Sequence, residues 1–176
     1  MDADKGERMP HAGDDPTATL IAELTRRGLR IAVAESLTGG LVMAELTRIP
    51  GASAVVSGGI VAYDTEVKHS LLGVDARLLA REGAVHPEVA RQMADGVRRA
   101  LAVGGRPADV GLATTGVAGP DGQDGQAPGT VFVGVATGNE VVSISLELSG
   151  DRHRIRSSTV RAAVDAVLAR LAPTME

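Results

Sequence analysis

Segments with helical periodicity alternate with short apolar runs along this 176-residue chain, and that alternation restricts its fold more than any other feature. A short apolar run bounded by turn residues is typical of a buried strand, whereas apolar residues spaced three and four apart indicate an amphipathic helix. Helices that alternate with buried strands cover both faces of a sheet. The sequence therefore predicts an α/β fold, a three-layer α/β/α sandwich around a mixed, mostly parallel sheet.

One domain accounts for most of the chain. Residues 1–16 offer little to bury, so we expect a disordered tail there, followed by a single domain over residues 17–176. Helices are expected over residues 20–28, 41–48, 65–72, 75–82, 87–101 and 151–171, and strands over residues 30–34, 52–63, 108–113, 129–137 and 140–148. The last two strands are expected to pair antiparallel through a turn at Gly138-Asn139.

The composition excludes several classes of protein. Apolar residues make up 44% of the chain, but Tyr63 and Phe132 are its only aromatic residues, so the core must be aliphatic. A net charge of −4 provides no basic surface for nucleic acid, and no apolar run is long enough to cross a membrane. The absence of cysteine excludes disulfides and a cysteine nucleophile. Because the N-terminus does not resemble a secretory signal, the cytoplasm is the expected location.

Common metal and nucleotide motifs are missing as well. The phosphate loop GxxxxGK[ST], the dinucleotide fingerprint GxGxxG, the metal motif HExxH and the nucleophile motif GxSxG do not occur. The histidines at positions 11, 69, 86 and 153 have no ligand-like spacing. We therefore expect neither a metal site nor a cofactor.

Three polar segments follow predicted strands. They are Ser36 with Thr38-Gly39-Gly40, Tyr63 with Lys68, and the Gly-rich loop from Thr114 to Gly125. The ends of strands in an α/β sheet can converge on one crevice, which is where ligands bind in such folds. We expect these segments to meet in one site.

The segment after the first strand allows two interpretations. Ser36 could be the N-cap of the following helix, or a nucleophile with Thr38 as the cap. The backbone N–H groups of Gly39 and Gly40 lie at the predicted positive end of that helix, where they could bind a phosphate or a developing oxyanion.

Lys68 could be an ordinary solvated lysine or a general base. A catalytic role requires burial or a neighbouring positive charge to bring its pKa from about 10.4 toward about 7 to 8. Thr65 shares a helix face with Lys68 and is a rival nucleophile or a partner. Tyr63 could be an edge residue, or it could lie against a pyridine ring or donate a hydrogen bond.

The remaining candidates bind rather than react. The loop from Thr114 to Gly122 is either a long crossover or a backbone cradle with two hydroxyls for a small polar ligand. Arg152, at the start of the last helix, could bind phosphate or could belong to a charged helix face. The sequence leaves these alternatives open.

Taken in order, these segments resemble the CinA C-terminal-domain family, the nicotinamide-nucleotide amidohydrolases also called NMN deamidases. The matching stretches are AESLTGG (34–40), GGIVAYDTEVK (58–68), LLGV (71–74), EGAVHPEVA (82–90), TTGVAGPDG (114–122), GTVFVGVA (129–136) and GDRHRIR (150–156). Two positions depart from the usual family pattern, because Leu37 replaces a cysteine and His86 replaces a serine.

The resemblance implies hydrolysis of nicotinamide mononucleotide to nicotinic acid mononucleotide and ammonia without a cofactor, in pyridine-nucleotide recycling. It implies Ser36 as nucleophile and Lys68 as base, with Tyr63 in the catalytic pocket. It also implies a homo-oligomer. The residues expected to bind substrate are Thr38, Gly39, Gly40, Thr114, Thr115, Gly116, Gly119 and Arg152.

Two alternatives remain at this point. The chain could be a catalytically weak nucleotide-binding protein that regulates a competence or damage response. It could also be an amidase for a different amide.

Overall fold

The computed structural model describes residues 15–138 and 140–172, which form one mixed five-stranded sheet of order β2-β1-β3-β4-β5. The strands are β1 (Ile31–Glu35), β2 (Val56–Val61), β3 (Val110–Gly116), β4 (Thr130–Thr137) and β5 (Glu140–Glu147). β1 pairs in parallel with β2 and β3, and β4 pairs antiparallel with β3 and β5. All strands except β4 therefore point the same way, as predicted for a mixed, mostly parallel sheet.

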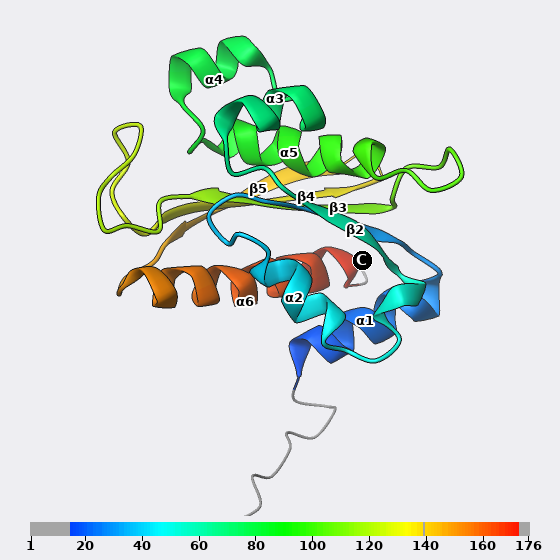
Figure 1. Cartoon of the computed structure of the whole chain (residues 1–176). Helices are drawn as coiled ribbons and strands as arrows, with labels where there is room; N and C mark the ends of the chain where they lie inside the picture. Colours follow the sequence, from blue (N-terminus) through cyan, green and yellow to red (C-terminus); the bar gives the residue numbers. More distant parts are fainter. Residues whose placement is uncertain (1–14, 139, 173–176) are drawn as a thin grey trace, which may run out of the picture.

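Helices cover both faces of this sheet (Figure 1), which confirms the three-layer sandwich. One face carries α1 (Pro16–Arg27), α2 (Leu41–Thr47) and α6 (Arg152–Leu171), and the other carries α3 (Thr65–Leu72), α4 (Ala76–Glu82) and α5 (Pro87–Ala100). None of the helices in the described residues has the length and apolarity needed to span a membrane.

The core is aliphatic, as the composition predicts. One buried cluster packs α1, α2 and α6 on the sheet and includes Leu20, Leu46 and Leu112, while the other lies under α5 and includes Ala34 and Met93. Every residue of β1 is buried, because β1 lies between two strands and under helices on both faces.

Glycines allow α5 to lie unusually close to the sheet. A Cβ atom at Gly111 would come within 1.9 Å of the carbonyl oxygen of Ala94, and one at Gly134 within 2.1 Å of that of Ala90. Helix backbone and strand backbone are therefore in direct contact, which only glycine permits. This contact fixes α5 and the segment that leads into it.

The fold begins slightly earlier than predicted. Asp15 accepts backbone hydrogen bonds from Thr17 and Ala18, and Pro16 is the first residue of α1. Proline is tolerated there because the first helical N–H needs no partner within the helix. α1 thus begins one residue before the predicted start of the domain at residue 17, and residues 1–14 lie outside the described part.

Two other boundaries differ from the prediction. Residues 52–63 do not form one strand, since a 3₁₀ turn (Ala52–Ala54) precedes β2. Thr114-Thr115-Gly116 belongs to β3 and not to the loop, and all three residues are buried. The predicted turn at Gly138-Asn139 includes Asn139, which lies outside the described residues. β4 and β5, on either side of it, do pair antiparallel.

Candidate active site

A cavity of about 240 Å³ lies where β1 and β3 end, beside the loop that follows β3. Six of the predicted site residues line it: Ser36, Tyr63, Thr115, Gly116, Gly119 and Arg152. Thr38, Gly39, Gly40, Thr114 and Lys68 do not. The cavity thus brings together six of the eleven predicted site residues, and the other five lie outside its lining.

Ser36 follows β1 directly. Its backbone N–H donates to the carbonyl of Thr114 at 2.9 Å, which joins the ends of β1 and β3. Its side chain borders the cavity, and its hydroxyl has no hydrogen-bond partner among the described residues. A small cavity with an unengaged hydroxyl in its wall is suited to attack on a bound carbonyl group.

Glu35 is a site residue that the sequence reasoning missed. Its fully buried carboxylate accepts hydrogen bonds from the backbone N–H groups of Gly40, Val42 and Met43 at 2.9 to 3.0 Å. A carboxylate at a helix N-terminus satisfies free donors and offsets the positive end of the helix. The sequence signal was an acidic residue at the end of an apolar strand, ahead of a helix whose N-cap, Gly40, has no side chain.

This cap overturns two expectations. The N–H of Gly40 is engaged by Glu35, and that of Gly39 donates to the carbonyl of Ser36 at 3.1 Å, so neither is free to bind an anion. Ser36 is not the N-cap of α2 either, because Gly40 occupies that position.

The hydroxyls of Thr38, Thr114 and Thr115 are buried and form hydrogen bonds within the protein. The hydroxyls of Thr38 and Thr114 are 2.8 Å apart and fully buried, which ties the turn after β1 to the end of β3. Thr115 lines the cavity but donates its hydroxyl to the carbonyl of Ala84 at 2.7 Å. Both hydroxyls of the proposed cradle, those of Thr114 and Thr115, thus have partners within the protein, and only Thr115 lines the cavity.

Arg156 also supports the turn that carries Ser36. Its guanidinium donates to the carbonyls of Leu37 at 3.0 Å and Thr38 at 2.8 Å. Leu37, one of the two departures from the family pattern, is buried in the core and borders the cavity. His86, the other departure, caps α5 by accepting a hydrogen bond from the N–H of Glu88.

Lys68 is buried, with 1% of its surface exposed, and is the only lysine among the described residues. Its Nζ donates to the carbonyl of Ala62 at 2.7 Å. Burial lowers the pKa of Lys68 from 10.5 to about 8, against the opposing effect of the carboxylates of Asp64 and Asp124. Much of the depression required for a general base is thus present.

Ala62 connects the segment of Lys68 with the strand that leads to Ser36. Its carbonyl accepts the Lys68 amine, and its N–H donates to the carbonyl of Glu35 at 2.8 Å, one residue before Ser36. No hydrogen bond joins Nζ and the Ser36 hydroxyl. Thr65, the rival nucleophile, is exposed and does not line the cavity.

Arg152 bridges two sides of the cavity. Its guanidinium donates to the hydroxyl of Tyr63 and to the carbonyl of Gly119, each at 2.9 Å. Neither partner is a carboxylate, so within the described residues its positive charge is not balanced by an ion pair. Tyr63 is 60% exposed and forms the rim of the cavity, not part of the core. The arrangement offers an unbalanced cation to an anionic group of a ligand.

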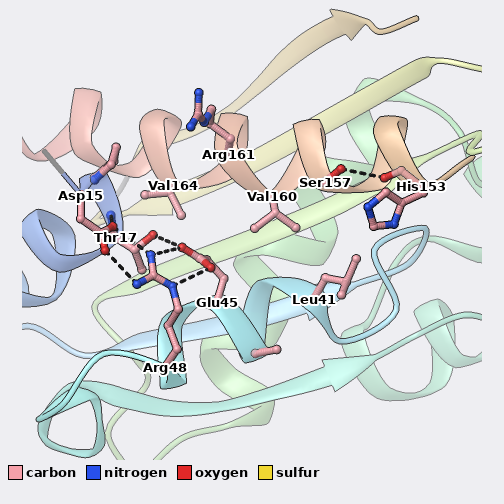
Figure 2. A pocket seen from close by; sticks show the side chains of 12 residues that line it. Asp15, Thr17, Leu41, Glu45, Arg48, His153, Ser157, Val160, Arg161 and Val164 are labelled. Carbon is pink, nitrogen blue, oxygen red and sulfur yellow. Dashed lines mark hydrogen bonds and ion pairs between the residues drawn. The ribbon is translucent and has the colours of Figure 1, made fainter. Parts of the chain in front are cut away.

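A larger groove lies elsewhere, between α1, α2 and α6 (Figure 2), with a volume of about 710 Å³. None of the predicted site residues lines it. Figure 2 shows Arg48 bonded to both Asp15 and Glu45, whereas Arg161 points away from these three side chains. Across residues 15–138 and 140–172, no cluster of histidine and acidic side chains could hold a metal ion.

Comparison with known proteins decides the family. The model of the CinA C-terminal domain matches residues 14–171. A CinA-like protein of Frankia casuarinae is 49% identical over 161 residues, which cover 92% of this chain and 36% of that protein. The chain belongs to the CinA C-terminal domain family. A putative competence-damage inducible protein of Halothermothrix orenii is 47% identical over 80% of this chain and 33% of its own length. The chain thus spans about a third of the curated relatives it matches.

Solved structures of the CinA superfamily share the fold over almost their full length. The competence/damage inducible protein CihA from Agrobacterium tumefaciens is 34% identical, with a TM-score of 0.82, covering 93% of this chain and 98% of its own. A competence or damage-inducible protein from Enterobacter asburiae is 31% identical, with a TM-score of 0.84, covering 93% of this chain and all of its own.

Proposed function

We propose that this CinA-type domain is an amidase that hydrolyses the carboxamide of nicotinamide mononucleotide, giving nicotinic acid mononucleotide and ammonia. The observation that carries the proposal is a serine hydroxyl without a partner among the described residues, in a small cavity, together with a buried lysine of lowered pKa whose amine bonds Ala62, the residue paired with Glu35. A nucleophile and an adjacent amine base are the minimum that acyl transfer requires. The resemblance of seven ordered sequence segments supplies the substrate.

The reaction proceeds in two stages. In the first, the neutral amine of Lys68 takes the proton of the Ser36 hydroxyl while Oγ forms a bond to the carboxamide carbon. The Lys68 ammonium then gives this proton to the amide nitrogen as the C–N bond breaks, and ammonia leaves. In the second stage, water adds to the Ser36 ester with Lys68 again as base, and the ester bond breaks to release the acid.

The oxyanion of each stage requires hydrogen-bond donors other than Gly39 and Gly40. Leu37, Ala118 and Gly119 border the cavity, and their backbone N–H groups have no acceptor among the described residues. Preorganised backbone donors of this kind stabilise a developing negative charge. We assign this role to the N–H of Leu37, which directly follows the nucleophile, together with the loop residues.

Arg152 binds the 5′-phosphate in this scheme. Its guanidinium lies at the rim of the cavity, bonded to the carbonyl of Gly119 and the hydroxyl of Tyr63 but to no carboxylate in the described part of the chain, and a phosphate would supply the missing negative charge. Binding energy from the phosphate, remote from the reacting bond, positions the amide for attack. Tyr63, whose hydroxyl accepts a hydrogen bond from the Arg152 guanidinium, lies at the same edge of the cavity.

The printed names of the relatives support a second candidate. Several are called putative competence-damage inducible proteins, so the domain could bind a nucleotide as part of such a response without turning it over. In either case we propose that the protein is a cytoplasmic homo-oligomer. Light scattering in solution would measure its mass and so test the oligomeric state.

Ammonia release from nicotinamide mononucleotide by the purified, chelator-treated chain tests the proposal. We expect turnover by the wild type and a loss of at least about 10³-fold in kcat for Ser36→Ala and for Lys68→Ala. Ser157→Ala, an exposed serine in the groove of Figure 2, is the matched control and should retain full activity. An inactive wild type that still binds the nucleotide would favour the regulatory candidate.

A further inference from the structure

We propose that Asp124 is a positioning residue of this site, which fastens the loop after β3 to the Gly83-Ala84 turn and holds a negative charge toward Lys68. The proposal deepens the proposed amidase function and rests on it for its catalytic consequence. The structural part stands on contacts between the loop, the turn and the cavity wall.

The loop that carries Asp124 is a closed hairpin. Gln123 and Gln126 exchange two backbone hydrogen bonds, of 3.1 and 2.8 Å, so that Asp124 and Gly125 form a two-residue tip. Both tip residues have positive φ angles, 52° and 75°, as tight hairpin turns require. Asp124 is the only non-glycine residue in the described part of the chain with such a φ. Asp-Gly is a preferred pair in such turns, so the hairpin itself places the Asp124 side chain at the tip of the loop.

The carboxylate of Asp124 makes a contact with a segment 40 residues away in the chain. Its Oδ2 accepts a hydrogen bond from the backbone N–H of Ala84 at 2.9 Å. A Cβ at Gly83 would lie 2.5 Å from Cγ of Asp124, so the approach depends on glycine at position 83. The loop tip and the turn before α5 are therefore built to fit each other.

This contact continues into the cavity wall. The carbonyl of Ala84 accepts the hydroxyl of Thr115 at 2.7 Å, and both residues line the cavity. Asp124, Ala84 and Thr115 thus form one hydrogen-bonded connection from the loop tip to β3. Without the carboxylate, the loop loses its contact with Ala84 and the wall loses its outer support.

The same carboxylate acts on Lys68. Among the described residues, two carboxylates act on the charge of this amine: Asp64, at the N-cap of its own helix, and Asp124, from the loop. Asp64 is held by the N–H of Glu66 within α3, whereas Asp124 reaches its place only because the loop folds back to Ala84. Both carboxylates favour the ammonium form and so oppose the effect of burial on the pKa of Lys68. Loop closure therefore influences the pH at which Lys68 becomes a base.

Two substitutions separate the contact from the charge. Asp124→Asn keeps an oxygen that can accept the Ala84 N–H but removes the negative charge. Asp124→Ala removes both. Asp165→Asn is the control, since Asp165 is an exposed carboxylate of α6 outside the cavity and does not act on Lys68.

The chain itself offers a direct measurement, because its only lysines are Lys5 and Lys68. In a Lys5→Arg background labelled with ¹³C-lysine, the single Cε resonance reports the titration of Lys68 alone. We expect a midpoint near pH 8, a decrease of about half a pH unit in Asp124→Asn at low salt, and no change in Asp165→Asn. An unchanged midpoint in Asp124→Asn would overturn the proposal.

Activity separates this proposal from the proposed function. If Lys68 is the base, the acid limb of the pH profile of kcat/KM moves with the resonance midpoint, and Asp124→Ala additionally increases KM. If the midpoint moves and the profile does not, Lys68 is not the base and the amidase mechanism fails, while the link between Asp124 and Lys68 stands. Equal KM values for Asp124→Ala and Asp124→Asn would contradict the positioning role.

Discussion

The groove between α1, α2 and α6 and the cavity at Ser36 differ in how well their polar groups are paired, and the larger of these two carries the weaker case for chemistry. The groove between α1, α2 and α6 has about three times the volume of the cavity at Ser36. In the groove, Arg48 is bonded to Asp15 and Glu45, and Thr17 donates its hydroxyl to Glu45. In the cavity, the Ser36 hydroxyl has no hydrogen-bond partner among the described residues, and Arg152 bonds Gly119 and Tyr63 but no carboxylate. Polar groups that satisfy one another stabilise a fold, whereas unmatched ones are available to a ligand.

The electrostatics of the two regions differ in the same sense. Hydrogen bonds from Arg48 lower the pKa values of Asp15 and Glu45, so these groups stay ionised and paired over the neutral range. Burial instead lowers the pKa of Lys68 to about 8, so that the amine changes its protonation state near neutral pH. The charges of the groove thus stay constant near neutral pH, whereas Lys68 can gain or lose a proton there.

The largest effect expected from the comparison is at Arg152. Arg152→Ala removes the charged hydrogen bonds proposed for the phosphate, each worth roughly 1.5 to 3 kcal/mol, so KM for nicotinamide mononucleotide should increase about 10- to 100-fold. Steady-state kinetics with the mononucleotide and with free nicotinamide measures it. The increase should be absent for nicotinamide, which has no phosphate.

Arg154→Ala provides the control for this experiment, because Arg154 is an exposed neighbour on α6 that does not line the cavity. Its KM should stay within about twofold of the wild type, as expected for a surface substitution. Equal losses at positions 152 and 154 would indicate a general charge effect and not a phosphate site.

The pH dependence should show a smaller effect. Only the neutral amine of Lys68 can act as base, and with a pKa of about 8 it is neutral in about a tenth of molecules at pH 7. The value of kcat/KM should therefore increase about tenfold from pH 7 to a plateau above pH 9. A profile that is flat or falls over this range would exclude Lys68 as the base.

The free energy of unfolding should also depend on the titration of Lys68. Because burial places the pKa of Lys68 below its unfolded value of 10.5, the unfolded chain binds more protons between pH 8 and 10.5. The free energy of unfolding should therefore increase with pH across this window, by an amount on the order of 2 kcal/mol. Urea titrations of Lys68→Met, which lacks the ionisable amine, should lack this increase.

The smallest effect is expected in the groove. Arg48→Ala removes the ion pairs with Asp15 and Glu45, in which the arginine side chain is 47% exposed. Partly exposed pairs contribute about 0.5 to 1 kcal/mol, so the melting temperature should decrease by only a few degrees. Amidase activity should change by less than twofold. A large loss of activity would show that the groove serves the reaction.

Much of the fold could be predicted because its signals are local. The apolar spacing of the last helix placed Ile155, Val164 and Leu171 on its buried side, where all three lie. The first predicted helix ends at residue 28, and Gly28 is the C-cap of α1, in the left-handed conformation. Periodicity and turn residues act within a few residues of each other, so a single sequence contains them.

The site was less predictable because its polar groups find partners far away in the chain. Thr114 and Thr115 resembled loop residues, but their hydroxyls meet Thr38, 76 positions away, and Ala84, 31 positions away. Polar side chains can occupy a buried strand only when such partners exist. Glu35 was missed for the same reason, and the burial of Lys68 depends on packing that the sequence does not specify.

The close packing of α5 on Gly111 and Gly134 limits which substitutions this domain can accept. At Gly111 and Gly134 the helix rests on strand backbone, so no side chain there can change rotamer to absorb a larger residue. Ala84 and Val85, in the cavity wall, lead directly into that helix. Residues at the rim can be exchanged to alter which ligand enters. The two glycines beneath α5 cannot, since any side chain there would lift the helix and the wall together.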